Sequence, residues 1–93
     1  MNHKKAFHIV LTGRVQGVGF RHFVQKTALT LHLEGWVRNK ADGSVELEVE
    51  GREETIQIFL DLVKRGNSFS RVDRMFKTEL PETSGYQSFF IKY

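Results

Sequence analysis

The stretch GWVRNKADGSVELEVEG, residues 35–51, contains the strongest fold signal in the chain. Its second half alternates strictly between apolar and polar side chains, which is typical of a strand with one face towards a core. We therefore predict strands at 35–39 and 44–50, with Asp42 and Gly43 in a tight hairpin turn between them. Three outward carboxylates of the second strand are expected to form a solvated acidic ladder rather than a metal site: Glu46, Glu48 and Glu50.

The segments before this hairpin predict a strand followed by a helix. Residues 6–12, AFHIVLT, are rich in apolar and β-branched side chains and end at Gly13, so we expect a strand with both faces largely buried. From residue 20 to 31 the apolar positions step by three and four, as in an amphipathic helix. A strand, a loop and a helix thus precede the hairpin.

After the hairpin, the pattern predicts a second helix and two more strands. The acidic pair Glu53 and Glu54 begins this helix, and Gly66 is its expected C-cap. Strands are expected at 70–78 and 88–93. The order is βαββαβ with a terminal strand, and two right-handed crossovers place both helices on one face. The predicted fold class is α+β, a ferredoxin-like βαββαβ sandwich with an antiparallel sheet and a short extra C-terminal strand.

Length and composition limit the classes of function. The 93 residues are enough for one domain, which we place at 1–93. There is no cysteine, which excludes disulfides, a thiol nucleophile and thiolate metal sites. No apolar run is long enough for a membrane span or a signal peptide, so we expect a soluble protein of the cytoplasm. The net charge of +3 favours an anionic ligand, without the dense basic stripes of a nucleic-acid binder.

The loop GRVQGVGFR, residues 13–21, carries the main candidate site. Because the first strand ends here and the helix begins, unpaired amides from Gln16 to Arg21 can converge on one anion. The Arg21 guanidinium adds a fork that grips two phosphate oxygens. The loop is neither a nucleotide P-loop nor a complete GxGxxG motif. Arg14 is either a second phosphate contact or a solvated side chain.

Asn39 is the second candidate, at the end of the strand predicted at 35–39. In a ferredoxin-like sheet this end can approach the glycine-rich loop, and a carboxamide holds a water molecule without adding negative charge. The alternative is an ordinary turn-forming asparagine. His22 is expected to be solvated or packed rather than phosphorylated.

Together, the loop 13–21 and the segment 35–51 resemble the two signature motifs of the acylphosphatases. The resemblance implies hydrolysis of acyl phosphates to a carboxylate and inorganic phosphate, with no metal or organic cofactor. Separately, we expect no nucleic-acid or membrane partner and a monomeric protein. The resemblance also implies roles for two side chains: Arg21 binds the phosphate oxygens, and Asn39 positions the attacking water. The implied phosphate-binding amides belong to Val15, Gln16, Gly17, Val18, Gly19 and Phe20.

Three other functions remain open at this point. One is an RNA-binding module, because RNA-recognition domains share the βαββαβ order. A second is an anion-binding module without catalysis. A third is a carbamoyl-phosphate-handling domain of the kind normally fused to a larger maturation enzyme, although the length of the chain favours the free enzyme. Hydrolysis of acetyl or benzoyl phosphate, with and without chelator, separates them.

Overall fold

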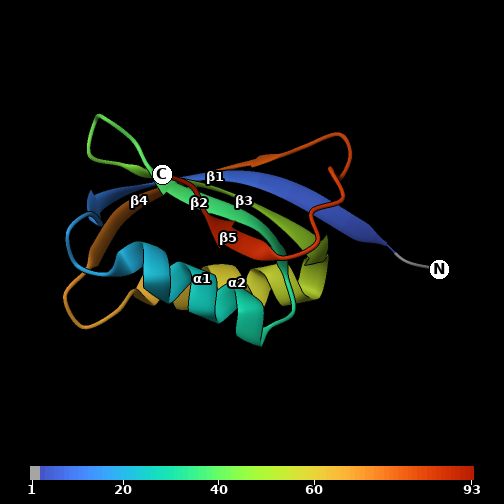
Figure 1. The fold of residues 1–93 in the computed structure, drawn as a ribbon, viewed down its shortest axis with the longest axis horizontal. Coiled ribbons are helices and arrows are strands. Elements are labelled where there is room, and N and C mark those ends of the chain that lie inside the picture. The colour runs from blue at the N-terminus through green and yellow to red at the C-terminus, as the bar shows by residue number, and fades with distance from the viewer. Residues whose placement is uncertain (1–2) are drawn as a thin grey trace.

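Two helices lie against one face of a five-stranded sheet in the computed structural model, which describes residues 3–93 (Figure 1). The expected order of strands and helices is confirmed, and each boundary lies within a few residues of its prediction. The elements are β1 (Lys4–Arg14), α1 (Phe20–Thr30), β2 (Glu34–Asn39), β3 (Val45–Arg52), α2 (Glu53–Arg65), β4 (Arg71–Glu79) and β5 (Phe89–Ile91).

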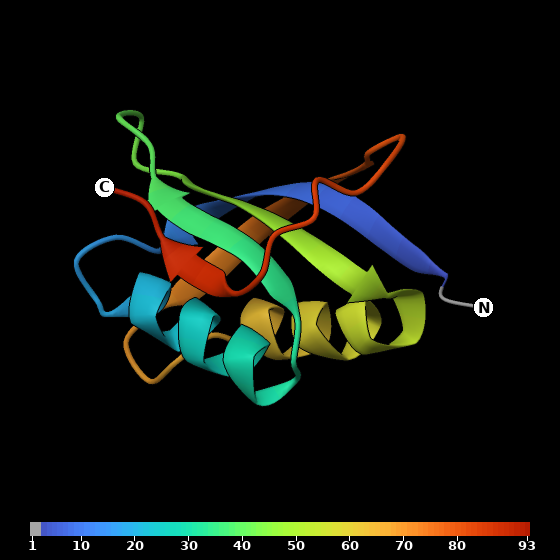
Figure 2. The same ribbon diagram turned by 45° about the vertical axis from the view of Figure 1, so that its right-hand side comes forward.

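The strands are arranged in the order β4-β1-β3-β2-β5. The first four pair antiparallel, as predicted, but β5 pairs with β2 in parallel, so the sheet as a whole is mixed. The parallel pairing follows from the connection at 80–88, which leaves β4 at one edge and crosses the sheet to the opposite edge (Figure 2).

The core lies between the sheet and the helices. The predicted helical stripe on α2 is buried in full: Ile56, Phe59, Leu60 and Val63. On α1 three of the five predicted positions are buried, Phe20, Val24 and Ala28, and the other two, Phe23 and Leu31, are partly buried against the core. On β1 the side chains that face the core are fully buried, and on the other face Ala6 is buried while His8 and Val10 are partly buried. The prediction that both faces of residues 6–12 are largely buried is therefore confirmed. Within residues 3–93, neither helix has the length and hydropathy needed to cross a lipid bilayer.

The sheet face opposite the helices carries the carboxylates expected to form a solvated ladder, and this expectation is wrong. Glu50 is only 2% exposed and accepts hydrogen bonds from the backbone amides of Ser84 and Gly85. Glu48 accepts a hydrogen bond of 3.2 Å from the Tyr86 hydroxyl. The connection between β4 and β5 therefore covers part of this face, held by carboxylates of β3.

The third carboxylate, Glu46, is hydrogen-bonded to side chains on the two adjacent strands. One of its oxygens lies 2.6 Å from His8 Nε2, and the other accepts a 2.6 Å hydrogen bond from Arg38 Nε. Partial burial raises the pKa of Glu46, but these hydrogen bonds more than offset burial, so the pKa lies below the ordinary 4.5.

Gly13 determines how β1 leaves the sheet. Its φ is 125°, and a Cβ atom there would collide with the carbonyl oxygen of Arg71 on the neighbouring strand. The register between β1 and β4 shifts between Thr12 and Gly13, as in a β-bulge. Only glycine fits this close approach, after which the chain turns into the loop before α1.

Candidate active site

The loop 15–19, between β1 and α1, has a conformation that requires its glycines. Gly17 and Gly19 both have φ near 72°, in the left-handed region that glycine adopts without strain. A Cβ at Gly17 would meet no protein atom within 4 Å, so conformation, not space, explains the residue there. Val15 and Phe20, each 1% exposed, anchor the two ends of the loop in the core.

The backbone amides of this loop are free to bind a ligand. Within residues 3–93, no hydrogen bond has its donor among the amides of residues 16–21, and the first bond of α1 runs from the Phe23 amide to the Gly19 carbonyl. Free amides at the start of a helix, where the helix dipole is positive, form a favourable environment for an anion. The predicted loop thus has the donors that a phosphate cradle needs.

Arg21 lies in the first turn of α1 and is half-buried. It forms no salt bridge with any carboxylate of residues 3–93. Its guanidinium carbon lies 5.1 Å from the centre of the Tyr93 ring, a cation–π contact. The ring supports the guanidinium without neutralising it, so its charge remains available to an anion.

Gln16 links the loop to the β2–β3 hairpin. Its Nε2 donates hydrogen bonds of 2.8 Å to the carbonyl oxygens of both Lys40 and Ser44. The side-chain donor Nε2 is thereby committed to protein partners, and the backbone amide is the donor that Gln16 can offer an anion. The two bonds hold the hairpin, and the neighbouring Asn39 with it, beside the loop.

Asn39 ends β2 on the helix side of the sheet. Side chains alternate along a strand, so Asn39 shares its face with Val37, which is fully buried, while Arg38 points to the opposite face. Because β1 and β2 both run antiparallel to β3, their C-terminal ends lie at the same end of the sheet, and α1 begins near that end. Asn39 Oδ1 is buried and has no hydrogen-bond partner among residues 3–93. A buried acceptor needs a partner, and a water molecule can provide it.

Tyr93 contacts Arg21 from the C-terminal segment, which follows β5 beside the end of β2. The Lys92 amide donates to the Val37 carbonyl at 2.9 Å, and Val37 pairs with Ile91. Continuing this parallel register by two residues sets Tyr93 level with Asn39, while its ring contacts Arg21. The structure therefore brings the loop, Arg21 and the end of β2 to the same end of the sheet.

The comparisons with known proteins identify the family of the chain. The sequence model of a family described as "Acylphosphatase" matches residues 7–91. An acylphosphatase from Bacillus pumilus is 50% identical over 86 residues, which is 92% of this chain and 96% of that protein. The chain belongs to the acylphosphatase family.

Solved structures extend the family relationship to the fold. The crystal structure of acylphosphatase from Bacillus subtilis has a TM-score of 0.93 and 45% identity, covering 96% of this chain and 99% of that one. Full-length HypF, in a phosphate- and nucleotide-bound form, has a TM-score of 0.88 and 33% identity, but the match covers only 12% of that chain. The acylphosphatase fold thus also occurs as a small part of a longer protein.

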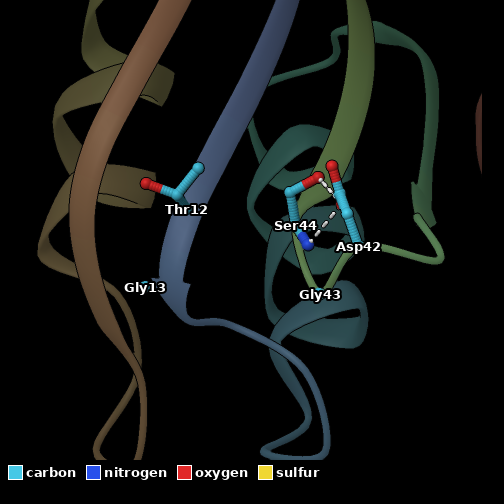
Figure 3. Close-up of a pocket in the computed structure, with 5 residues that line it drawn as sticks. All are labelled: Thr12, Gly13, Asp42, Gly43 and Ser44. Carbon is cyan, nitrogen blue, oxygen red and sulfur yellow. Dashed lines mark hydrogen bonds between the residues drawn. The ribbon is translucent and has the colours of Figure 1, made fainter.

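A hollow of about 190 Å³ lies next to the loop but does not suit the anionic substrates of an acylphosphatase (Figure 3). Its lining residues are Thr12, Gly13, Asp42, Gly43 and Ser44. The Asp42 carboxylate accepts hydrogen bonds from the Ser44 hydroxyl and amide, which lower the pKa of Asp42 and keep it ionised. Figure 3 shows the Thr12 hydroxyl pointing away from this pair. A fixed negative charge repels a phosphate.

Two further sequence candidates, Arg14 and His22, are both exposed, which agrees with the solvated side chain expected for His22. In the described part of the chain, no three His, Asp or Glu side chains lie close enough together to hold a metal ion.

Two contacts of the loop and Arg21 were missed by sequence reasoning. They are the Tyr93 ring over Arg21 and a hydrogen bond from Asn67 to the Val18 carbonyl. An asparagine directly after a helix C-cap is typical of a turn, so its pattern gave no signal of this role.

Proposed function

We propose that the chain hydrolyses the carboxyl-phosphate bond of small acyl phosphates, with Arg21 and the amides of residues 15–20 binding the phosphate and Asn39 positioning the water. The observation that carries the proposal is the set of amides at residues 16–21 that donate to no group of residues 3–93, beside a guanidinium that has no carboxylate partner among the same residues. Both features favour a dianionic group at the start of α1.

In the proposed reaction, water oxygen attacks phosphorus and the bond from phosphorus to the carboxylate oxygen breaks. An acyl phosphate dianion and water give a carboxylate and dihydrogen phosphate, so atoms and charge balance. The leaving carboxylate has a conjugate acid with a pKa of about 4, so it departs without a protein acid. The phosphate oxygens accept the proton of the water. What the protein supplies is orientation and charge stabilisation, which dominate phosphoryl transfer.

Asn39 is the proposed water-positioning residue. Its buried Oδ1 has no hydrogen-bond partner in the described part of the chain, so a water that donates to it would satisfy the oxygen and be held in one orientation. Gln16 contributes indirectly, because its hydrogen bonds keep the hairpin that carries Asn39 against the phosphate loop.

The test is hydrolysis of acetyl phosphate by the wild type and by Arg21→Lys, with activity expected to persist in the presence of chelator. We expect Arg21→Lys to lower kcat/KM by about a hundredfold, since a point charge replaces a bidentate fork. Arg65→Lys is the matched control, because Arg65 is an exposed residue near the end of α2. Near-normal activity in Arg21→Lys would contradict the proposed role.

Asn39→Ala separates water positioning from binding. It should lower kcat much more than it weakens inhibition by inorganic phosphate, because the side chain acts on the water rather than on the phosphate. Equal losses in kcat and in phosphate affinity would assign Asn39 to substrate binding instead.

The RNA-binding alternative is disfavoured by the sheet face opposite the helices. The outward positions at the centre of β1 and β3 are His8, Val10, Glu46 and Glu48. The two carboxylates repel RNA phosphates, and the His8 ring, the one aromatic group among them, is bound to Glu46 at 2.6 Å. The connection 80–88 also covers part of this face. We further propose that the protein acts as a monomer in the cytoplasm, which light scattering after gel filtration and cell fractionation would test.

A further inference from the structure

We propose that Asn67, in the loop between α2 and β4, is a positioning residue that orients the phosphate-binding loop. The inference rests on the proposed function and adds a residue that neither signature motif contains. Asn67 Nδ2 donates a 2.8 Å hydrogen bond to the carbonyl oxygen of Val18, across 49 positions of sequence. Both ribbon views place the two loops side by side at one end of the molecule (Figures 1 and 2).

Because the peptide bond is planar, the hydrogen bond to the Val18 carbonyl also sets the direction of the Gly19 N–H. The Val18 carbonyl and the Gly19 amide belong to one trans peptide group, so they point in opposite directions. A hydrogen bond that fixes the carbonyl towards Asn67 therefore turns the Gly19 N–H away from Asn67. Because Gly19 has φ 72° and glycine reverses the sign of φ at little cost, this peptide group would rotate readily without an anchor.

Asn67 is itself held in place by its own loop. Its backbone amide donates to Ser70 Oγ at 2.9 Å, and the Ser70 amide donates back to the Asn67 carbonyl at 3.3 Å. These bonds fix the backbone of Asn67 and therefore the position from which its side chain reaches Val18. Asn67 thus belongs to a hydrogen-bonded turn.

The chemistry of the side chain matches this task. Val18 offers an acceptor, so the anchor must be a donor, and the neutral carboxamide supplies one without placing a negative charge near the phosphate. Asn67 Oδ1 is buried and unpartnered among residues 3–93. An unpaired buried acceptor lowers stability, a cost that is tolerated where a group has a functional task. Asn67 touches the loop and not the substrate, so it acts by orienting the Gly19 amide.

The experiment compares Asn67→Ala and Asn67→Asp with the control Ser68→Ala, an exposed neighbour in the same loop. The probes are inorganic phosphate, titrated while the Gly19 amide is followed by NMR, and acetyl phosphate for KM and kcat. We expect Asn67→Ala to weaken phosphate binding and raise KM by about fivefold, the worth of one hydrogen bond. Because the amide would hold phosphate in substrate and transition state alike, kcat should stay within about twofold.

Asn67→Asp should be the more severe variant. It keeps the size of asparagine but removes the donor and adds a charge that repels the phosphate, so we expect an affinity loss of more than about tenfold. It also supplies the comparison if Asn67→Ala does not fold. The Gly19 amide resonance should shift in both variants before any phosphate is added, and Ser68→Ala should match the wild type in every measurement.

Two results would overturn the proposal. One is an unchanged KM, phosphate affinity and Gly19 resonance in folded Asn67 variants. The other is a fall in kcat that follows the loss of thermal stability while KM is unchanged, which would show a structural role alone. If the wild type binds phosphate with the expected Asn67 dependence but does not hydrolyse acetyl phosphate, the proposed function fails and the positioning role stands.

Discussion

Replacing Glu50 by glutamine should loosen the connection that crosses the open sheet face. The carboxylate of Glu50 is 2% exposed and accepts the backbone amides of Ser84 and Gly85, one with each oxygen. Glutamine keeps the volume and one accepting oxygen, but its amide nitrogen would face a second N–H donor. One hydrogen bond is lost, and the other changes from a charged to a neutral acceptor.

The size of the effect follows from these two bonds. A hydrogen bond to a charged group contributes about 1.5–3 kcal/mol, and removing the buried charge recovers part of that in desolvation, which leaves a net loss of about 2 kcal/mol in unfolding free energy. For a domain of this length, that loss lowers Tm by about 10 °C. Glu50 pairs with Ala6 near the start of β1, far from the phosphate loop, so activity well below Tm should not change.

Thermal and urea unfolding at neutral pH, followed by circular dichroism, measure the loss. Glu82→Gln is the matched control, because Glu82 lies in the same connection and is exposed. A Tm for Glu50→Gln within about 2 °C of the wild type would refute the reasoning. So would an equal loss in Glu82→Gln, since the effect would then come from net charge and not from the buried contact.

Two further predictions concern Glu46 and Tyr93. Since the folded-state pKa of Glu46 lies below its ordinary 4.5, its bonds to His8 and Arg38 stabilise the fold above that pH and are lost as pH falls below it. The difference in unfolding free energy between wild type and Glu46→Gln should therefore shrink between about pH 5 and pH 3, and a constant difference in urea titrations would contradict this. Tyr93→Ala should raise KM for acetyl phosphate about threefold through loss of the cation–π contact, with Tm unchanged because Tyr93 as a residue is 95% exposed. Tyr93→Phe should retain the wild-type KM, and equal behaviour of the two variants would exclude a role for the ring.

The strands and helices could be predicted from the sequence because the spacing of apolar residues and the positions of turn and cap residues are local signals. The alternation of Val45, Leu47 and Val49, the stripe on α1 and the C-cap at Gly66 each depend on neighbours in the chain. The parallel pairing of β5 and the burial of Glu50 depend on segments more than 30 residues apart. The alternation of apolar and polar residues shows which side chains point away from the core, but not whether a distant loop covers them.

The candidate site divides in the same way. The loop glycines and the first turn of α1 are local, so the cradle was predicted with the residues that the structure brings together. The contacts of Asn67 with Val18 and of Tyr93 with Arg21 join opposite parts of the chain, and neither residue type has a distinctive pattern. The roles of Arg21 and Asn39 in catalysis remain predictions until the variants are measured.

The contact between Tyr93 and Arg21 has a practical consequence for protein fusions. A polypeptide attached after Tyr93 would begin beside Arg21, where it would occupy space that the substrate needs and could contact the Arg21 guanidinium. One attached ahead of Lys4 would emerge at the far end of β1, whose eleven residues extend ~36 Å of the 39 Å long axis. Affinity tags and reporter domains therefore belong on the N-terminal side.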